Sequence, residues 1–166
     1  MPEKYPEYGQ CVHELLRAPG NSGVLFQRNH CGVYRSADFG NSWQEITKGL
    51  LSDFGFPLTI HPREPETIYV VPLQGAEFRC PPESRLRMFR SRDGGKNWQA
   101  LATGLPQQEI FCGCYRESMA NDTLAPAGIY LGTNTGKLFA TRDEGDAWFV
   151  LADNLPPINS VEAEVV

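Results

Sequence analysis

The octapeptide SRDGGKNW, residues 91–98, decides the fold because two variants of it recur, SADFGNSW at 36–43 and TRDEGDAW at 141–148. The three tryptophans of the protein are the last residues of these stretches and stand 55 and 50 residues apart. A repeat of about this period is the signature of a propeller or a solenoid, with one supersecondary unit per repeat. The sequence therefore predicts a threefold repeat.

The similarity extends beyond the octapeptides. Each is preceded by a short β-type run with an aromatic residue two positions before its Ser or Thr, and the three aromatics are Tyr34, Phe89 and Phe139. Each is followed by a second short β-type run, and a leucine lies seven residues after each tryptophan. Because the flanking residues also match, the three octapeptides are not similar by chance.

The chemistry of the octapeptide is that of a hairpin turn. Asp, Ser and Thr side chains accept hydrogen bonds from N–H groups of their own turn, and Gly adopts the positive φ that such turns require. The Trp begins the returning strand and is large enough to fill the gap between adjacent sheets. A structural role is therefore predicted for Ser36, Asp38, Gly40, Trp43, Ser91, Asp93, Gly95, Trp98, Thr141, Asp143, Gly145 and Trp148. A catalytic role for the aspartates is disfavoured, because nothing in such a turn directs a carboxylate at a substrate.

Four β-type runs per repeat predict four antiparallel strands, which is the make-up of a propeller blade. No segment of ten or more residues shows helical periodicity, so the predicted fold class is all-β. The strands are expected at 11–16, 24–27, 32–35 and 42–46, at 57–61, 67–71, 86–90 and 97–101, and at 110–115, 128–132, 137–140 and 147–151. Blades at about 10–50, 56–105 and 109–155 would follow a tail over 1–9, with an extra strand at 160–165.

Three blades and one strand are too few to close a ring, since propellers contain roughly four to eight blades. Two arrangements satisfy this count. In the favoured one, the chain is a fragment of a six- to eight-bladed propeller; in the other, two copies complete each other. In both cases unclosed blade edges favour self-association of the isolated chain.

The pattern Ser/Thr-x-Asp-x-Gly-x-x-Trp resembles the Asp-box, or BNR repeat, of bacterial sialidases, sortilin-type receptors, some xyloglucan hydrolases and a photosystem assembly factor. Residues 29–36, 52–57 and 155–157 are similar to bacterial proteins described as sialidase-like or as WD40/YVTN/BNR-like repeat proteins. The resemblance covers nearly the whole chain and implies a β-propeller. Because enzymes and non-enzymes share the box, the resemblance alone does not imply an activity.

Net charge and composition exclude some classes of binding partner. The net charge of −5 and the pI near 5.2 argue against a nucleic-acid partner, which requires a basic face. No apolar run approaches the ~20 residues that cross a bilayer, so no membrane association is expected. Residues 1–9 lack the apolar core of a signal peptide, and the chain as written is expected to be cytoplasmic, with any export signal on additional N-terminal sequence.

The five cysteines form no CxxC pair, and their odd number does not predict a disulfide framework. Cys112 and Cys114 are expected on one face of a strand as small buried hydrophobes, with a redox or metal role as the alternative. There is no glycine-rich phosphate loop and no HExxH motif. The sequence therefore predicts neither a cofactor nor a metal.

The expected ligand site of a propeller is the mouth of its central channel, lined by inner strands and the loops between blades. The polar candidates on those segments are His13, His30, Asp53, His61, Arg79 and Arg116. Arg17 and Glu117 lie next to them in the sequence and are also considered. Histidines titrate near neutral pH and bind metals or orient substrates. The alternative is that each histidine is a structural residue whose hydrogen bonds are satisfied within the fold. The sequence favours this alternative for each histidine considered singly.

Two functions are compatible with these sequence features. The first is a non-catalytic module that binds a protein or a glycan. The second is a fragment of a sialidase-like glycoside hydrolase with most catalytic residues outside this chain. The sialidase resemblance implies a tyrosine nucleophile helped by a glutamate and a clamp of three arginines. Only Tyr115-Arg116-Glu117 offers such residues together, and alternation places its arginine on the opposite face of the strand. The binding module is therefore the preferred prediction.

Overall fold

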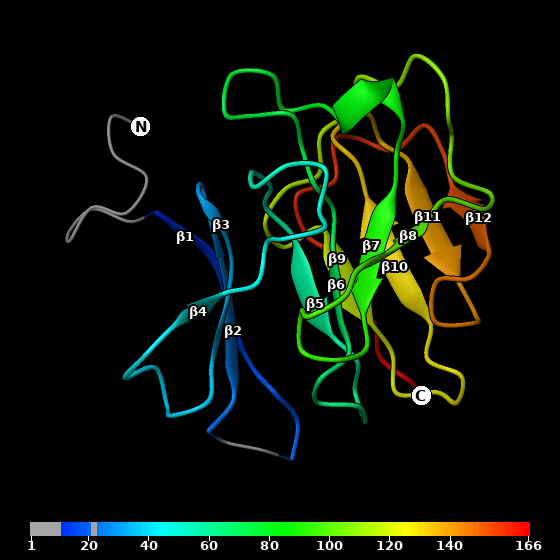
Figure 1. The fold of residues 1–166 in the computed structure, drawn as a ribbon. Helices are drawn as coiled ribbons and strands as arrows, with labels where there is room; N and C mark the ends of the chain where they lie inside the picture. Colours follow the sequence, from blue (N-terminus) through cyan, green and yellow to red (C-terminus); the bar gives the residue numbers. More distant parts are fainter. Residues whose placement is uncertain (1–10, 21–22) are drawn as a thin grey trace.

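The computed structural model describes residues 11–20 and 23–166, so the tail predicted over 1–9 lies outside the described residues. Within them the chain forms three four-stranded antiparallel sheets, which confirms the all-β prediction (Figure 1). The first sheet holds β1 (Val12–Arg17), β2 (Leu25–Asn29), β3 (Gly32–Ser36) and β4 (Gln44–Glu45). The second holds β5 (Leu58–Ile60), β6 (Ile68–Val70), β7 (Met88–Ser91) and β8 (Gln99–Leu101), and the third holds β9 (Met119–Asn121), β10 (Ile129–Gly132), β11 (Leu138–Thr141) and β12 (Trp148–Ala152).

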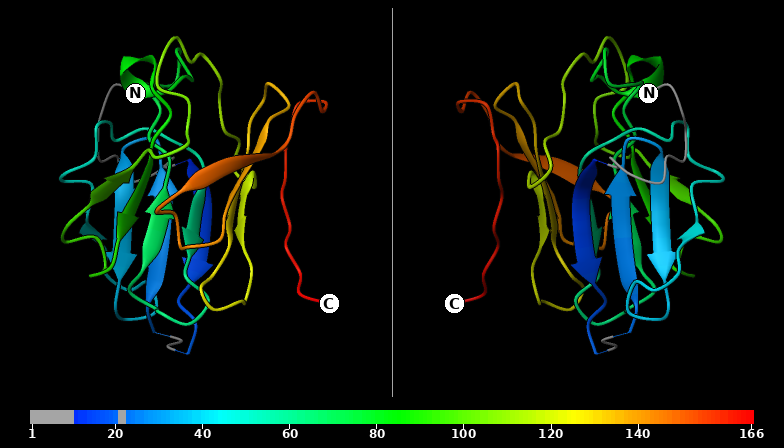
Figure 2. Two further views of the ribbon diagram at one scale, coloured as in Figure 1. Left: turned by 90° about the vertical axis from the view of Figure 1, so that its right-hand side faces the viewer. Right: turned by 90° about the vertical axis from the view of Figure 1, so that its left-hand side faces the viewer.

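Each sheet is a meander whose strand order follows the chain. The first strands are neighbours across the sheets, because β5 contacts both β1 and β9. The sheets stand side by side with these inner strands together, as the two views of Figure 2 show. This arrangement is that of propeller blades, and the chain is a partial β-propeller.

Apolar side chains fill the two gaps between neighbouring sheets. The gap between the first and second sheets holds Phe26, Val33, Ile46, Ile68, Val70 and Phe89. The gap between the second and third sheets holds Tyr69, Met88, Leu101, Ile129, Leu131 and Phe139. Because side chains alternate along a strand, β6 supplies Ile68 and Val70 to one gap and Tyr69 to the other. The middle sheet is thereby buried on both faces.

The box tryptophans occupy these gaps in the second and third repeats. Trp98 donates its indole N–H to the carbonyl of Ile46 in the preceding sheet, at 2.9 Å. Trp148 is 5% exposed and its backbone N–H bonds to the Thr103 carbonyl, which follows the preceding sheet. Trp43 belongs to the first sheet, and it is 38% exposed. Each box tryptophan thus packs against the sheet before its own where the structure describes one.

The prediction of an inner strand at 110–115 is wrong. The third sheet begins with β9 instead, and β9 pairs with β10. The backbone of Gly113 exchanges hydrogen bonds with Asn134, through the side-chain oxygen and the backbone N–H of that residue, so this segment lies against the β10–β11 turn. Cys112 and Cys114 are buried as predicted, although they lie outside any strand.

The extra strand predicted at 160–165 does not form either. Ser160 makes one isolated bridge to Glu117, and the N–H of Val161 donates to the Glu117 carbonyl at 2.8 Å. The connection between β6 and β7 is an irregular loop that contains the 3₁₀ turn η1 (Pro82–Ser84). Within residues 11–20 and 23–166, no helix has the length and apolar character needed to span a bilayer.

Candidate functional site

Four of the six polar residues expected at the channel mouth meet at one end of the inner strands. His13 enters from β1, His30 from the β2–β3 turn, and Arg79 and Arg116 from the loops around η1 and before β9. They surround Phe54 and Phe56, whose rings are 5.2 Å apart between centroids. These six side chains are called the mouth cluster below.

His13 is the most deeply buried polar member of the mouth cluster, at 5% exposure. The register of β1 against β2 shifts between Val12 and Glu14, at His13 itself, and such irregularities redirect single side chains. The ring Nδ1 lies 2.6 Å from the Gly55 carbonyl oxygen. A carbonyl only accepts, so Nδ1 carries the proton. Burial is the main cause that lowers the pKa of His13, to about 4, and the ring is neutral at neutral pH.

His30 stands at the tip of the hairpin between β2 and β3. The N–H of Cys31 donates to the side-chain oxygen of Asn29 at 2.7 Å, which closes the turn locally. Gly32 follows with a φ of +154°, and a Cβ there would lie 2.3 Å from Thr47 Oγ1, so a larger residue would displace Thr47. The His30 ring is thereby held 4.5 Å from that of His13, edge to face. Burial first, and then the charges of Arg116 and Arg79, lower the pKa of His30.

Two exposed arginines cover the buried Phe56 ring. The guanidinium carbon of Arg116 lies 5.0 Å from the ring centroid, and that of Arg79 lies 5.3 Å from it. Both distances are within the range of cation–π attraction. Arg79 also donates to the Ala76 carbonyl of its own loop at 3.2 Å. The mouth cluster therefore presents two fixed cations above an aromatic floor.

Arg28 supports this floor and was not singled out from the sequence. It is fully buried, and it donates to the carbonyls of Phe54 at 3.0 Å and Pro57 at 3.3 Å. Burial lowers its pKa to about 9, and the negative charge of Asp53 acts in the opposite direction. A Cβ on Gly55 would lie 2.0 Å from its guanidinium nitrogen, so glycine is required there. No local pattern distinguishes Arg28 from the other arginines, because its partners are 26 and 29 residues away.

His61 is not brought to the mouth cluster. It follows β5, whereas Gly55, which contacts His13, precedes that strand, so the two histidines lie at opposite strand ends. The Nδ1 atom of His61 accepts from the N–H groups of Arg63 and Glu64, at 3.2 and 3.0 Å. Its Nε2 atom lies 3.5 Å from a carboxylate oxygen of Glu144.

The turns formed by the three octapeptides, called boxes here, lie at the same end as His61 and follow β3, β7 and β11. In the second box, Ser91 donates to Asp93 at 2.8 Å, and Asp93 accepts from the backbone and side-chain N–H groups of Asn97 at 2.9 and 2.7 Å. The first and third boxes repeat the hydroxyl and backbone contacts, with Asp38 and Asp143 accepting. The carboxylates are occupied by their own turns.

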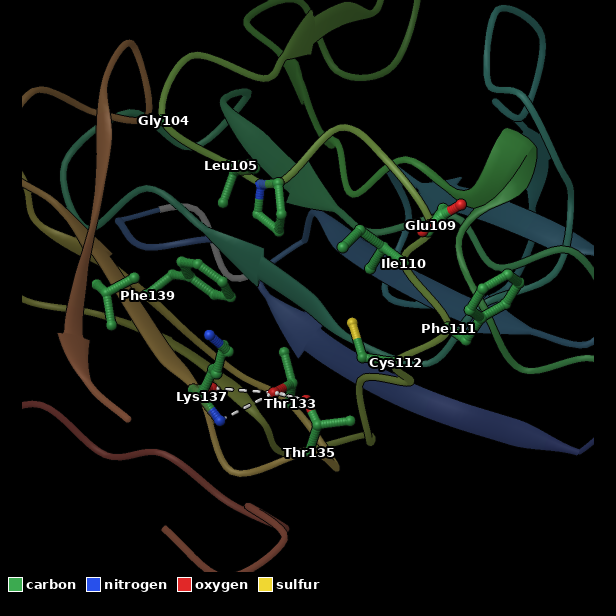
Figure 3. Close-up of a pocket in the computed structure, with 12 residues that line it drawn as sticks. Gly104, Leu105, Glu109, Ile110, Phe111, Cys112, Thr133, Thr135, Lys137 and Phe139 are labelled. Atoms are coloured by element: carbon green, nitrogen blue, oxygen red, sulfur yellow. Dashed lines mark hydrogen bonds between the residues drawn. The ribbon is translucent and has the colours of Figure 1, made fainter. Parts of the chain in front are cut away.

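A mostly apolar hollow lies away from the mouth cluster and shares no residue with it. It has a volume of about 590 Å³ and is bounded by the linker from β8 to β9 on one side and by the β10–β11 turn, β11 and β12 on the other. Figure 3 shows Leu105, Ile110, Cys112 and Phe139 around it, with Thr133 hydrogen-bonded to Lys137 at its polar edge. Pockets of this kind take small apolar ligands, but its lining offers few polar groups to orient one.

Solved structures of several other proteins are similar to this chain. An ancestral GH74 enzyme matches with a TM-score of 0.64 and 21% identity, over 86% of this chain and 18% of that one. The GH74 xyloglucanase from Xanthomonas campestris matches with a TM-score of 0.65 and 19% identity, over 84% of this chain and 20% of that one. YCF48 bound to a D1 peptide matches with a TM-score of 0.54 and 15% identity, over 91% and 46%. The likeness shows the fold, a β-propeller, and this chain spans less than half the length of each.

Neither a scan of protein-family models nor a search of curated proteins finds a match to this sequence.

Proposed function

We propose that this chain is part of a non-catalytic propeller module that binds a protein or glycan partner through the mouth cluster. The observation that carries the proposal is the pair of guanidinium groups of Arg79 and Arg116 over the Phe56 ring. Arginine forks bind carboxylates in bidentate fashion, and cation–π attraction to the buried aromatic floor holds the two guanidinium groups in place. The ligand that fits is an anionic group, such as a carboxylate on a peptide or a sugar.

Two further observations support binding without turnover. The box aspartates accept hydrogen bonds in their own turns, at the strand ends opposite to the mouth cluster. The similar fold of YCF48 is solved with a D1 peptide, so a propeller of this shape can hold a peptide.

The test is a binding screen with acidic peptides and with a glycan array that includes sialosides. Replacement of Arg116 by Ala is expected to weaken the best ligand by about tenfold or more, since a hydrogen bond to a charged group contributes roughly 1.5–3 kcal/mol. Arg142→Ala is the matched control, because Arg142 also stacks on a phenylalanine, Phe149 at 5.3 Å, but on the third sheet. Equal loss in both variants, or no retained ligand, contradicts the proposal.

A second candidate is a fragment of a sialidase-like glycoside hydrolase. The observation that favours it is the same pair of arginines, which offers two of the groups that hold a substrate carboxylate, on a fold shared with GH74 enzymes. Cleavage of a fluorogenic sialoside, abolished by Arg116→Ala and retained in Arg142→Ala, would replace the binding proposal with this one.

We also propose that the outer sheets are covered by further blades, as in a fragment of a larger propeller, or by a second copy. The first sheet exposes Leu15 and Trp43, and the third exposes Phe149 and Leu151. Apolar side chains on unpaired sheets favour association. Light scattering of the isolated chain at micromolar concentration is expected to give a mass above that of the monomer, and a single monomer mass contradicts self-association.

A further inference from the structure

Three side chains with metal-binding atoms converge at the mouth cluster, two of them members of it. Cys11, His13 and His30 each offer one ligand atom, and these atoms all lie within 4.8 Å of one another. Cys11 and His13 are two residues apart at the start of β1, and His30 comes from the turn that faces that end of β1, where Val12 pairs with Asn29. The sequence shows no metal motif here because the third ligand comes from a different segment.

His13 has the hydrogen-bonding arrangement of a metal ligand. Its Nδ1 donates to the Gly55 carbonyl, so the lone pair resides on Nε2. Histidines that bind metals usually donate their second nitrogen to a carbonyl or carboxylate in this way. Nε2 is buried and has no hydrogen-bond partner within the part of the chain that the structure describes. A buried acceptor without a partner costs free energy, and a bound cation removes that cost.

Cys11 supplies the softest of the three ligands. It is a free, partly exposed thiol, and the guanidinium of Arg116 donates to its Sγ at 3.9 Å. The thiolate is the form of cysteine that binds metals. His30 completes the set, with its ring 4.5 Å from that of His13. The positive charge of Arg116 opposes a cation at this place, and the negative charge of the thiolate offsets it.

We propose that Cys11, His13 and His30 form a binding site for Zn²⁺ or a similar thiophilic cation. One thiolate and two imidazoles are ligands that Zn²⁺ prefers, and three protein ligands leave its fourth tetrahedral position open. Ca²⁺ and Mg²⁺ require oxygen ligands and do not suit this set. Two of the three ligands, His13 and His30, belong to the mouth cluster, but the test of the site does not rest on the proposed function, because the metal alone is the probe.

The test measures Zn²⁺ uptake by the reduced full chain after chelation and dialysis. About one equivalent per chain is expected, as for a single three-ligand site. Cys11→Ser and His13→Ala are each expected to weaken uptake by about tenfold or more. Cys80→Ser is the matched control, since Cys80 is also a free, partly exposed thiol, and its Sγ contacts Gln74 instead. Equal uptake by the wild type and Cys11→Ser, or no uptake by the wild type, overturns the proposal.

Cobalt substitution provides a second readout that a folding defect does not imitate. Co²⁺ bound through Cys11 gives a thiolate-to-cobalt charge-transfer band in the near ultraviolet. The band is expected in the wild type and in Cys80→Ser, and its absence in Cys11→Ser with an unchanged circular dichroism spectrum supports the site. A band of undiminished intensity in Cys11→Ser places the cobalt on another cysteine and overturns the assignment.

Discussion

Removal of the third box tryptophan should destabilise the protein far more than removal of the first. Trp148 is 5% exposed and fills the gap between the second and third sheets, whereas Trp43 is 38% exposed. A buried Trp→Ala change costs about 3–5 kcal/mol through lost transfer free energy and the cavity left behind. The same change at Trp43, which already exposes more than a third of its surface, should cost about 1 kcal/mol or less. Both residues end the same turn, so the difference isolates packing between sheets.

Urea unfolding followed by far-ultraviolet circular dichroism measures this difference without relying on tryptophan fluorescence. With a denaturant slope of about 2 kcal/mol/M, Trp148→Ala should lower the urea midpoint by about 2 M. Trp43→Ala should lower it by about 0.5 M or less. Trp148→Phe is the intermediate variant if Trp148→Ala does not fold, and it should fall between the two.

The protein concentration must be one at which sedimentation shows a monomer, because a second copy over Trp43 would change its burial. If Trp43→Ala then destabilises the monomer as much as Trp148→Ala, the inference that tryptophans pack against the preceding sheet is refuted.

Two further predictions concern the turns and linkers. Hydrogen bonds, first from the Asn97 side chain, lower the pKa of Asp93 to about 2. In the folded protein this carboxylate therefore stays ionised to a lower pH than an ordinary aspartate does. It should contribute about 1 kcal/mol of stability above pH 4, after allowance for solvent screening, which is lost as the pH falls from about 4 towards 2. Urea midpoints of wild type and Asp93→Asn should therefore converge at low pH, and a constant gap contradicts this. Gly104→Ala should cost about 2–4 kcal/mol, because a Cβ there lies 1.9 Å from the Trp148 carbonyl oxygen at a φ of +83°. Gly75→Ala, with open space around the new atom, should change stability by about 0.5 kcal/mol or less, and similar midpoints for the two variants would show that the linker relaxes.

Much of the fold is predictable because its signals are local. The spacing of the boxes sets the number of repeats, and alternation within a strand such as β6 assigns its side chains to two different gaps. The error at 110–115 has a nonlocal cause. That apolar run has the composition of a strand, but the backbone of Gly113 finds its partners in Asn134. An apolar run alone does not reveal with which other segment its backbone forms hydrogen bonds.

The mouth cluster was predictable only in part. His13, His30, Arg79 and Arg116 could be selected as polar residues on strand ends and loops, but no pattern separated them from His61. Their meeting depends on contacts between distant segments, such as that of His13 with Gly55, 42 residues away.

The sequence by itself determined the threefold repeat, the all-β class and the positions of the turns, because turn chemistry and strand alternation act within a few residues. Only the tertiary structure decided which strand end each polar side chain occupies, that Arg28 is buried under the mouth cluster, and that Cys11, His13 and His30 converge. The reason is physical: those arrangements follow from how separate sheets pack, and a shift of one residue in register would send the same side chains to the opposite face.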